Sequence, residues 1–478
     1  MKLSCFNRPG RLSFCAVLTA AILQSLSAGA QSASTYAAHR PLPRRANLIL
    51  IVADGLGYGD LRCYGQKHFQ TPELDRLAAG GIRFTSFYAG DAEVSPAFAA
   101  LLLGRNPAHL RQSADLHAPL AANDATVAKV LKQSGYHTGY IGQWDLGDEG
   151  TSGAPWKQGF EEFAGYLGPR DVETAYADFM WRFAPGSVLD STNGRRRDFI
   201  GKETIYANTG GRKTEYIPDL LTKAALNFIR NNQPDPFNNH RPFFLVLQYQ
   251  IPGAGDPVVP SDAPYSEEPW PQPERNKAAA ITRLDGYIGQ LLEQLDKLGQ
   301  ASNTVVFFTS DTGPARGGGV DPAFLQSTGR FRGGRGDLYE GGLRAPLLVR
   351  WPGRIPAGQV SDLPHAAWDF LPTAADIALV NPPADLDGHS FVRALMGQKA
   401  ASGRQFFYWR LDRGSAVEQA ARQGGWKIIR TRPNEKWELY NLGADPGETQ
   451  NVADKNPGVL ARFERQLPKP QTARPSGL

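Results

Sequence analysis

The chain has 478 residues, of which 41% are hydrophobic and 21% charged. This composition supports a full hydrophobic core and excludes disordered and fibrous classes of protein. The formal net charge is only +5, and the sequence has neither a basic tail nor a zinc-binding pattern, so nucleic acid is not an expected partner. The length fits three domains of about 150 residues each, or one large α/β domain with a smaller one.

The first 30 residues have the three-part pattern of a secretory signal peptide. Basic residues precede an apolar stretch over 12–26, and small residues at 28–30 form a cleavage site. The apolar stretch is short for a membrane span, and polar residues interrupt it. We therefore predict cleavage near Ala30 and export to the periplasm or the medium. No membrane attachment is expected after cleavage, and Cys63 is the only cysteine that the mature chain keeps.

The next part of the chain alternates between predicted strands and helices. Residues 31–45 are rich in Ser, Ala and Pro and are predicted to be a flexible lead-in segment. Continuous apolar runs predict buried strands of a parallel sheet at 47–53, 138–141, 243–249 and 304–309. Apolar residues at helical spacing predict helices over 126–134 and 281–298. This alternation indicates an α/β fold over residues 46–400, with a large mixed, mostly parallel sheet sandwiched by helices.

The chain changes character toward its C-terminus. Short aromatic-rich segments at 404–410, 425–430 and 437–442 are separated by turn residues. They predict a small antiparallel α+β subdomain over residues 401–466. The Pro-rich residues 467–478 are predicted to be a loose tail.

Two carboxylates follow predicted strands directly, at Asp54 and Asp311. In open parallel sheets, functional sites form beyond the carboxyl ends of the strands. Two carboxylates delivered to this edge could share a hard cation such as Ca²⁺ or Mg²⁺. Either residue alone would more often cap the turn after its strand, so the metal site depends on the pair.

Three N-terminal blocks resemble the sulfatases, exported sulfate-ester hydrolases of the alkaline-phosphatase superfamily. The blocks are Asn47–Gln66 (NLILIVADGLGYGDLRCYGQ), Thr71–Phe84 (TPELDRLAAGGIRF) and Val94–Arg105 (VSPAFAALLLGR). The likeness continues in the family's order through 126–147, 303–314, 331–353 and 438–451. It covers nearly all of the mature chain and implies an arylsulfatase-type protein, whose site residues can be compared with this sequence one by one.

The resemblance places the catalytic nucleophile at Val94. Sulfatases carry C-x-P-x-R or S-x-P-x-R, whose first residue is oxidised to formylglycine, whereas this stretch reads VSPAF. Val94 has no heteroatom to oxidise, so no formylglycine is expected. Phe98 replaces the Arg that helps to hold the nucleophile, while Arg105 is kept. Ser95 is a weaker alternative nucleophile because it lies one residue out of register, and Cys63 belongs to a separate block.

The resemblance also implies a weakened metal site. The family has two adjacent Asp after the first strand and Asp-Asn after the later one. Here Asp54 is followed by Gly55, and Asp311 by Thr312. Because Ca²⁺ takes six to eight oxygens, Ca²⁺ or Mg²⁺ binding is expected to be weakened unless further ligands fill in. The candidates for that role are Ser95, Asp91, Glu93 and water.

The sulfate-binding cations of the family are depleted in the same way. Its K-W-H-L-G block reads QWDLG here, so Gln143 replaces a Lys and Asp145 replaces a His. A further His is replaced by Gly253, and Arg335 stands for the Lys of the L-R-G-G-K-G block. Cleavage of the ester requires stabilisation of the negative charge that builds up in the transition state. The pocket instead gains a carboxylate.

We therefore predict an exported sulfatase-fold protein without formylglycine-dependent activity, that is, a pseudoenzyme with a binding or accessory role. The expected ligand is a sulfated or other anionic small molecule or glycan, and a retained cleft is compatible with a protein partner. The alternative is an active sulfuric- or phosphoric-ester hydrolase that uses Ser95 or a metal-activated water, with Asp54 and Asp311 holding the metal.

Overall fold

The strands and helices follow the apolar runs of the sequence in a computed structural model. It describes residues 45–110, 118–168, 171, 175–189, 195–233, 241–250, 259–398, 406–413, 416–432 and 435–468. The predicted signal peptide, the lead-in segment up to residue 44 and the tail from residue 469 lie outside the described residues.

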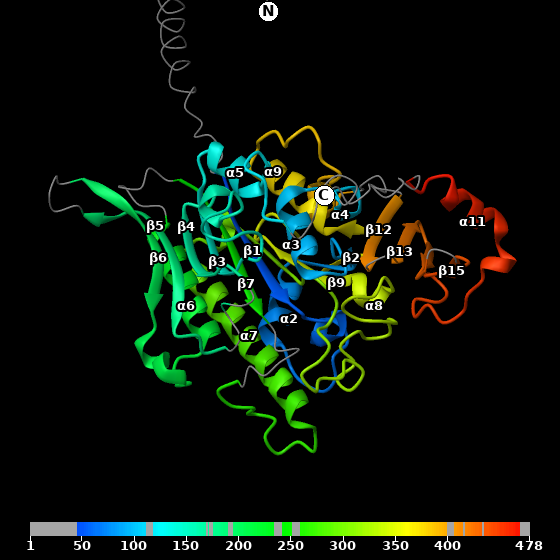
Figure 1. The fold of residues 1–478 in the computed structure, drawn as a ribbon, viewed down its shortest axis with the longest axis horizontal. Coiled ribbons are helices and arrows are strands. Elements are labelled where there is room, and N and C mark those ends of the chain that lie inside the picture. Colours follow the sequence, from blue (N-terminus) through cyan, green and yellow to red (C-terminus); the bar gives the residue numbers. More distant parts are fainter. Residues whose placement is uncertain are drawn as a thin grey trace, which may run out of the picture. The chain divides into compact units, whose positions relative to one another are not determined.

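A large mixed sheet forms the centre of the fold (Figure 1). Its order is β10-β2-β9-β8-β1-β7-β3-β4-β5-β6, and β11 pairs with β2. Strands β8, β1, β7, β3 and β4 run parallel, while β9 is antiparallel to both of its neighbours. The mixed, mostly parallel sheet of the prediction is therefore confirmed. The strands are β1 (Asn47–Asp54), β2 (Ile82–Tyr88), β3 (His137–Gln143), β4 (Glu162–Tyr166), β5 (Phe179–Leu189), β6 (Arg196–Thr204), β7 (Phe243–Gln250), β8 (Thr304–Thr309), β9 (Arg344–Arg350), β10 (Gln359–Ser361) and β11 (His365–Ala366).

Helices cover both faces of this sheet, because alternate residues of β1 point to opposite sides. Leu48, Leu50 and Val52 pack in one core cluster with α3, α5 and α9. Ile49 and Ile51 pack in a second cluster with α2, α6 and α7. Figure 1 shows α3, α5 and α9 on one side of the sheet and α6 and α7 on the other. The helices of four or more residues are α2 (Pro72–Ala79), α3 (Val94–Leu103), α4 (Pro107–Leu110), α5 (Val127–Gln133), α6 (Ile217–Asn231), α7 (Gln272–Lys297), α8 (Glu340–Leu343), α9 (Phe370–Ile377), α10 (Val392–Leu395) and α11 (Pro457–Glu464).

A smaller antiparallel sheet follows in the chain, as predicted. Its strands are β12 (Phe406–Arg413), β13 (Ala416–Gln423), β14 (Trp426–Arg430) and β15 (Glu438–Asn441), in that order. Helix α11 packs on it through Phe463, which shares a core cluster with Tyr408, Ile428 and Leu439. Strand β13 (AVEQAARQ) has no continuous apolar run, which is why the sequence did not reveal it.

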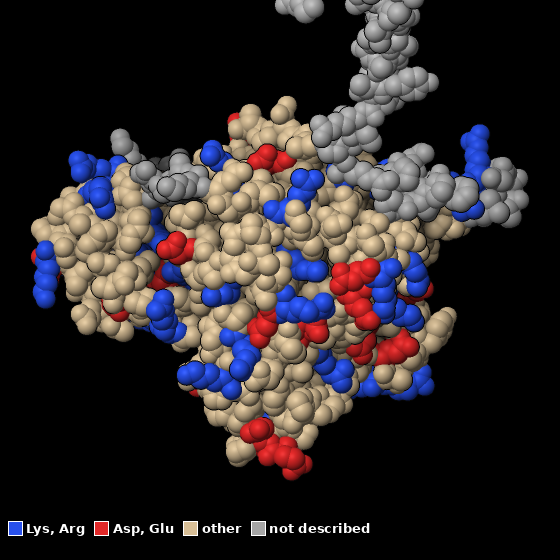
Figure 2. Space-filling model, turned by 180° about the vertical axis from the view of Figure 1, so that it is seen from behind, with Lys and Arg blue, Asp and Glu red and all other residues tan. Residues whose placement is uncertain are grey.

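The surface carries charges of both signs. Figure 2 shows Lys and Arg side chains interspersed with Asp and Glu over one face of the molecule. No helix in the described part of the chain combines the length and the apolar character that crossing a membrane requires.

Candidate functional site

The carboxyl ends of β1 and β8 place four of the sequence-derived site residues together. Asp54 ends β1, and Asp311 and Thr312 follow the neighbouring strand β8. Arg335 lies between them: its guanidinium forms an ion pair with the Asp54 carboxylate, and its Nε donates to Thr312 Oγ1 at 3.1 Å. Thr312 Oγ1 in turn donates to Asp311 Oδ1 at 3.3 Å. The guanidinium is thus paired with one carboxylate and joined to the second through the Thr312 hydroxyl.

Gly55 makes room for this guanidinium. Its φ of +81° lies in the left-handed region that favours glycine. A Cβ built on Gly55 would lie 2.6 Å from Arg335 Nη2, closer than two such atoms can approach. Arg335 thus takes the space that a side chain at residue 55 would need. Sequence reasoning identified both positions but missed that one fills the space of the other. The available signal in the sequence was that both positions differ from the family pattern together, with Gly55 in place of the second Asp and Arg335 in place of the Lys.

Asp311 is the most deeply buried carboxylate of the group, with 1% of its surface exposed. Its Oδ2 has no hydrogen-bond partner among the described residues. Burial, together with the nearby charge of Asp54, raises the pKa of Asp311 well above its ordinary value, although Arg335 opposes the shift. The site therefore favours a protonated Asp311 beside an ion-paired Asp54.

Asp145 approaches the same edge from the end of β3. It has a positive φ of 57°, and its backbone N–H donates to Leu167 O at 3.0 Å. The Gln143 side-chain amide donates to one Asp145 carboxylate oxygen, and the other has no partner among the described residues. Burial raises the pKa of Asp145 to about 7; the Gln143 hydrogen bond opposes this shift, and the charge of Asp54 adds to it. This carboxyl group can therefore exchange a proton near neutral pH.

Tyr140 is a residue of the site that sequence reasoning missed. Its hydroxyl forms hydrogen bonds to Gln143 O and Gln248 Oε1. Burial raises its pKa well above the ordinary value, and the charges of Asp145, Asp311 and Asp54 add to the shift. Tyr140 thus lies behind all three carboxylates. The sequence placed it only within the predicted strand at 138–141.

The nucleophile position lies at the first turn of α3. Val94 is half-buried, and Ser95 forms no hydrogen bond to any described residue that could accept its proton. Asp91 supports the turn before this helix, since its Oδ1 accepts from Glu93 N at 3.1 Å. Phe98 is 1% exposed and packs against the rings of Tyr140 and Trp144, so it is a core residue rather than part of the pocket.

The structure does not bring Arg105 to this group. Arg105 follows the C-terminal end of α3, a helix of about 15 Å whose first turn holds Val94. Its Nε donates to Asp385 O at 3.0 Å. Gly253, the position of the second missing His, lies outside the described residues.

The residues present do not fit a divalent cation. Within the described ranges, no three Asp, Glu, His or Cys side chains lie close enough together to hold a metal ion. Arg335 already occupies the Asp54 carboxylate and Thr312 Oγ1. Among the described residues, the side-chain oxygens at this edge that have no partner are Asp311 Oδ2, Asp145 Oδ1 and Gln143 Oε1. Ca²⁺ requires six to eight oxygen ligands. The cation that this arrangement holds is a guanidinium.

The fold and this edge of the sheet define an α/β protein of the alkaline-phosphatase type. Residues 46–380 match the family described as "Sulfatase", and residues 335–471 match "N-sulphoglucosamine sulphohydrolase, C-terminal". The chain therefore belongs to the sulfatase family.

Two curated relatives and one solved structure are similar over most of their length. Arylsulfatase A of Homo sapiens is 32% identical, with the aligned region covering 91% of this chain and 90% of that protein. The N-acetylgalactosamine-6-O-sulfatase of Bacteroides thetaiotaomicron is 30% identical, covering 90% and 94%. The structure of Ps i-CgsB in complex with k-i-k-neocarrahexaose is 27% identical with a TM-score of 0.71, covering 88% of this chain and 92% of that one.

Proposed function

We propose that this protein is a sulfatase-family pseudoenzyme that binds a sulfated or other anionic glycan and does not hydrolyse it. One observation carries the proposal: the Arg335 guanidinium fills the space at Gly55 and pairs with Asp54, in the place where a metal ion would need its oxygens. The half-buried Val94 at the nucleophile position supports it, because a valine offers no atom for attack. The relatives are named for sulfate esters of sugars or are bound to an oligosaccharide, which supports the class of ligand.

A hydrolysis assay with a matched inactive variant tests the loss of catalysis. The purified mature chain is incubated with aryl sulfate and aryl phosphate esters in added Ca²⁺, Mg²⁺ or Mn²⁺, beside Asp54→Ala/Asp311→Ala. We expect equal background rates from both proteins. Hydrolysis that disappears in the double variant would refute the pseudoenzyme and identify an ester hydrolase.

The second candidate is such a hydrolase, and the Asp145 carboxyl group favours it. A carboxyl with a pKa of about 7 can give a proton to a leaving oxygen at neutral pH, with Ser95 or water as the nucleophile. This reading requires turnover that Asp145→Asn abolishes and that falls as the pH rises above 7. Activity insensitive to Asp145→Asn would exclude the role.

We further propose export with cleavage after Ala30, on the basis of the leader pattern in the sequence. The test is N-terminal sequencing of the protein recovered from the periplasm and from the medium of an expressing bacterium. We expect mature chains that begin at Gln31. Recovery of chains that still begin at Met1, in the cytoplasm alone, would contradict export.

A further inference from the structure

A cavity of about 750 Å³ lies between the large sheet and the turn that joins β13 to β14. We call it the seam cavity. Four of its lining side chains are basic and one is acidic, and two are aromatic. The basic residues are Arg330, Arg344, Arg422 and Arg462, the acidic residue is Asp362, and the aromatic residues are Phe331 and Trp426.

Arg344 is held firmly by the fold at the inner side of the cavity. Strand β2 shifts register between Phe84 and Phe87, which frees Thr85 and Ser86 from pairing with β9. Arg344 Nη1 uses both of them, donating to Thr85 O at 2.6 Å and to Ser86 Oγ at 2.7 Å. Such fixed side chains bind a ligand without losing further conformational freedom.

Arg422 is the least satisfied of the buried cations. It is 8% exposed, its Nε donates to Gly424 O at 3.1 Å, and its Nη1 bonds to the Tyr88 hydroxyl. Its Nη2 makes no hydrogen bond to a described residue, and no described carboxylate forms an ion pair with this guanidinium. Tyr88 passes this contact on to a carboxylate, because its hydroxyl donates to Glu340 Oε2 at 2.8 Å. The remaining Nη2 donors are left for an anion in the cavity, a partner that a guanidinium favours.

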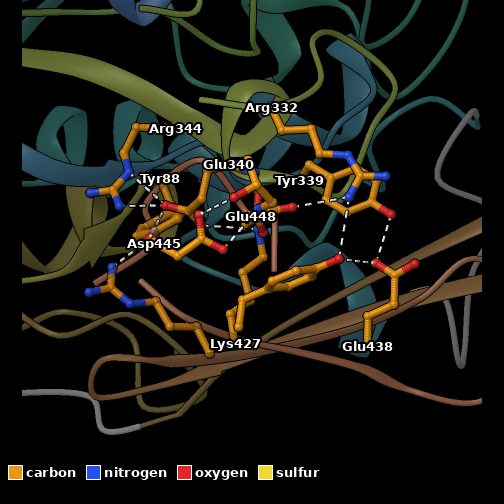
Figure 3. Close-up of polar contacts among 12 residues, drawn as sticks. Tyr88, Arg332, Tyr339, Glu340, Arg344, Lys427, Glu438, Asp445 and Glu448 are labelled. Carbon is orange, nitrogen blue, oxygen red and sulfur yellow. Dashed lines mark hydrogen bonds and ion pairs between the residues drawn. The ribbon is translucent and has the colours of Figure 1, made fainter. Parts of the chain in front are cut away.

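The charges behind the seam cavity compensate for Arg422 only in part, because Arg422 shares the charge of Glu340 with Arg344 and Lys427. Figure 3 shows Lys427 directed at Glu340 and Glu448, with Arg344 also reaching Glu340. Lys427 Nζ lies 3.0 Å from Glu340 Oε1 and 2.9 Å from Glu448 Oε1, and Arg344 forms an ion pair with Glu340. Three buried cations, with Arg422 as the third, thus face two buried carboxylates. The surplus positive charge borders the seam cavity.

The seam cavity is separate from the site at Asp54. Strand β2 lies three strands from β1 in the sheet, which corresponds to about 14 Å. The small sheet also shows that the two sites are separate. At one end of its β12–β13 hairpin, the Arg413 guanidinium donates to the carbonyl of Gly336, the residue after Arg335. At the other end of β13, seven residues and about 23 Å away, Gln423 lines the seam cavity.

We propose that the seam cavity binds an acidic saccharide, with a sulfate or carboxylate group on Arg422 and a sugar ring against Trp426. The forked guanidinium matches the oxygens of either anion, and the exposed Arg330 and Arg462 add positive charge at the mouth. The half-buried Trp426 offers an amphipathic ring face, and the volume suits a ligand larger than a bare ion. This binding goes beyond the proposed function, because it does not depend on the chemistry at Asp54.

Isothermal titration calorimetry of the full chain tests the proposal with four probes. They are a sulfated tetrasaccharide, its desulfated counterpart, a uronic-acid tetrasaccharide and inorganic sulfate. We expect the sulfated or the uronic-acid sugar to bind, and which of them binds more tightly identifies the anion. The desulfated sugar and inorganic sulfate should bind at least about tenfold more weakly than the tighter of the two, because each lacks one of the two contacts. If inorganic sulfate binds as tightly as the sugars, the ligand is not a saccharide and the proposal is wrong. If none of the sugars binds, the seam cavity is not a saccharide-binding site.

Variants locate the binding. Arg422→Gln should weaken it by about tenfold or more, and Arg330→Gln/Arg462→Gln, at two exposed positions, by about threefold. Arg354→Gln, at an exposed arginine outside the cavity, should bind like the parent. If Arg422→Gln does not fold, Arg330→Gln/Arg462→Gln decides on its own. Parental affinity in both cavity variants would place the ligand elsewhere and overturn the proposal.

Discussion

At the scale of single residues, the contact of Gly55 with Arg335 defines the character of the cleft. Gly55 has a φ of +81°, and an added Cβ would lie 2.6 Å from Arg335 Nη2, so a side chain at residue 55 forces the guanidinium to shift. Restoring a side chain at residue 55 both strains the backbone and displaces the guanidinium from Asp54. The effects of changes at the two positions should therefore not be additive.

We expect Gly55→Ala to lower the free energy of unfolding by about 2 kcal/mol, of which about half is the left-handed backbone. Gly353→Ala is the matched control, because Gly353 has a φ of +76° with nothing within 4 Å of its added Cβ. That control should cost only about 1 kcal/mol. In an Arg335→Ala background, the loss in free energy of unfolding caused by Gly55→Ala should decrease to that of the control. Urea denaturation of the parent and the four variants measures these costs, and equal costs of Gly55→Ala in both backgrounds would contradict the contact.

The raised pKa of Asp145 makes a second prediction at this scale. Between about pH 4 and pH 7 the unfolded chain has lost the proton that the folded protein keeps, so stability decreases as the pH rises through this range. We expect the contribution to be about 2 kcal/mol, less than the full shift because water partly screens the side chain. Asp145→Asn should remove this part of the pH dependence. Parallel curves of unfolding free energy against pH for both proteins would show that Asp145 is not the group responsible.

At the scale of elements, continuous apolar runs made some of the buried strands predictable. Strands such as β1 and β8 are buried on both faces, so continuous apolar runs revealed them. Strand β13 and the first turns of α7 are rich in polar residues and were missed. The juxtaposition of Asp54 with Asp311 was predictable, because both follow parallel strands. The pairing of Asp54 with Arg335, 281 residues away, was not, because it depends on the backbone at Gly55.

Helix α3 resists restoration of the family motif. Phe98 lies in the core between Tyr140 and Trp144, so an arginine there would bury a charge among aromatic rings. We expect Phe98→Arg to destabilise the protein by about 4 kcal/mol and Phe98→Leu by about 1 kcal/mol, as measured by thermal unfolding. A Phe98→Arg variant as stable as Phe98→Leu would mean that the new side chain reaches the cleft.

At the scale of the whole molecule, buried ion pairs join the small sheet to the large one. Lys427 of β14 is completely buried between Glu340 of α8 and Glu448. We expect Lys427→Met to cost about 3–5 kcal/mol, because it leaves the Glu448 carboxylate buried without a cation and Glu340 with Arg344 as its remaining ion-pair partner. Lys297→Met removes an exposed ion pair with Glu293 and should cost at most about 0.5 kcal/mol. Denaturant unfolding compares them, and similar small losses would show that the junction does not depend on this charge.

The cation beside Asp54 is a side chain of the protein itself, Arg335, and this affects how the protein responds to its surroundings. A bound metal ion is governed by mass action, so dilution, a chelator or scarcity of the ion empties its site and removes the stability that it provided. A cation carried on the chain has no such equilibrium. The cleft should keep its shape wherever the protein is carried, whatever the supply of divalent ions. A melting temperature that stays the same in EDTA and in millimolar Ca²⁺ is the expected signature of this independence.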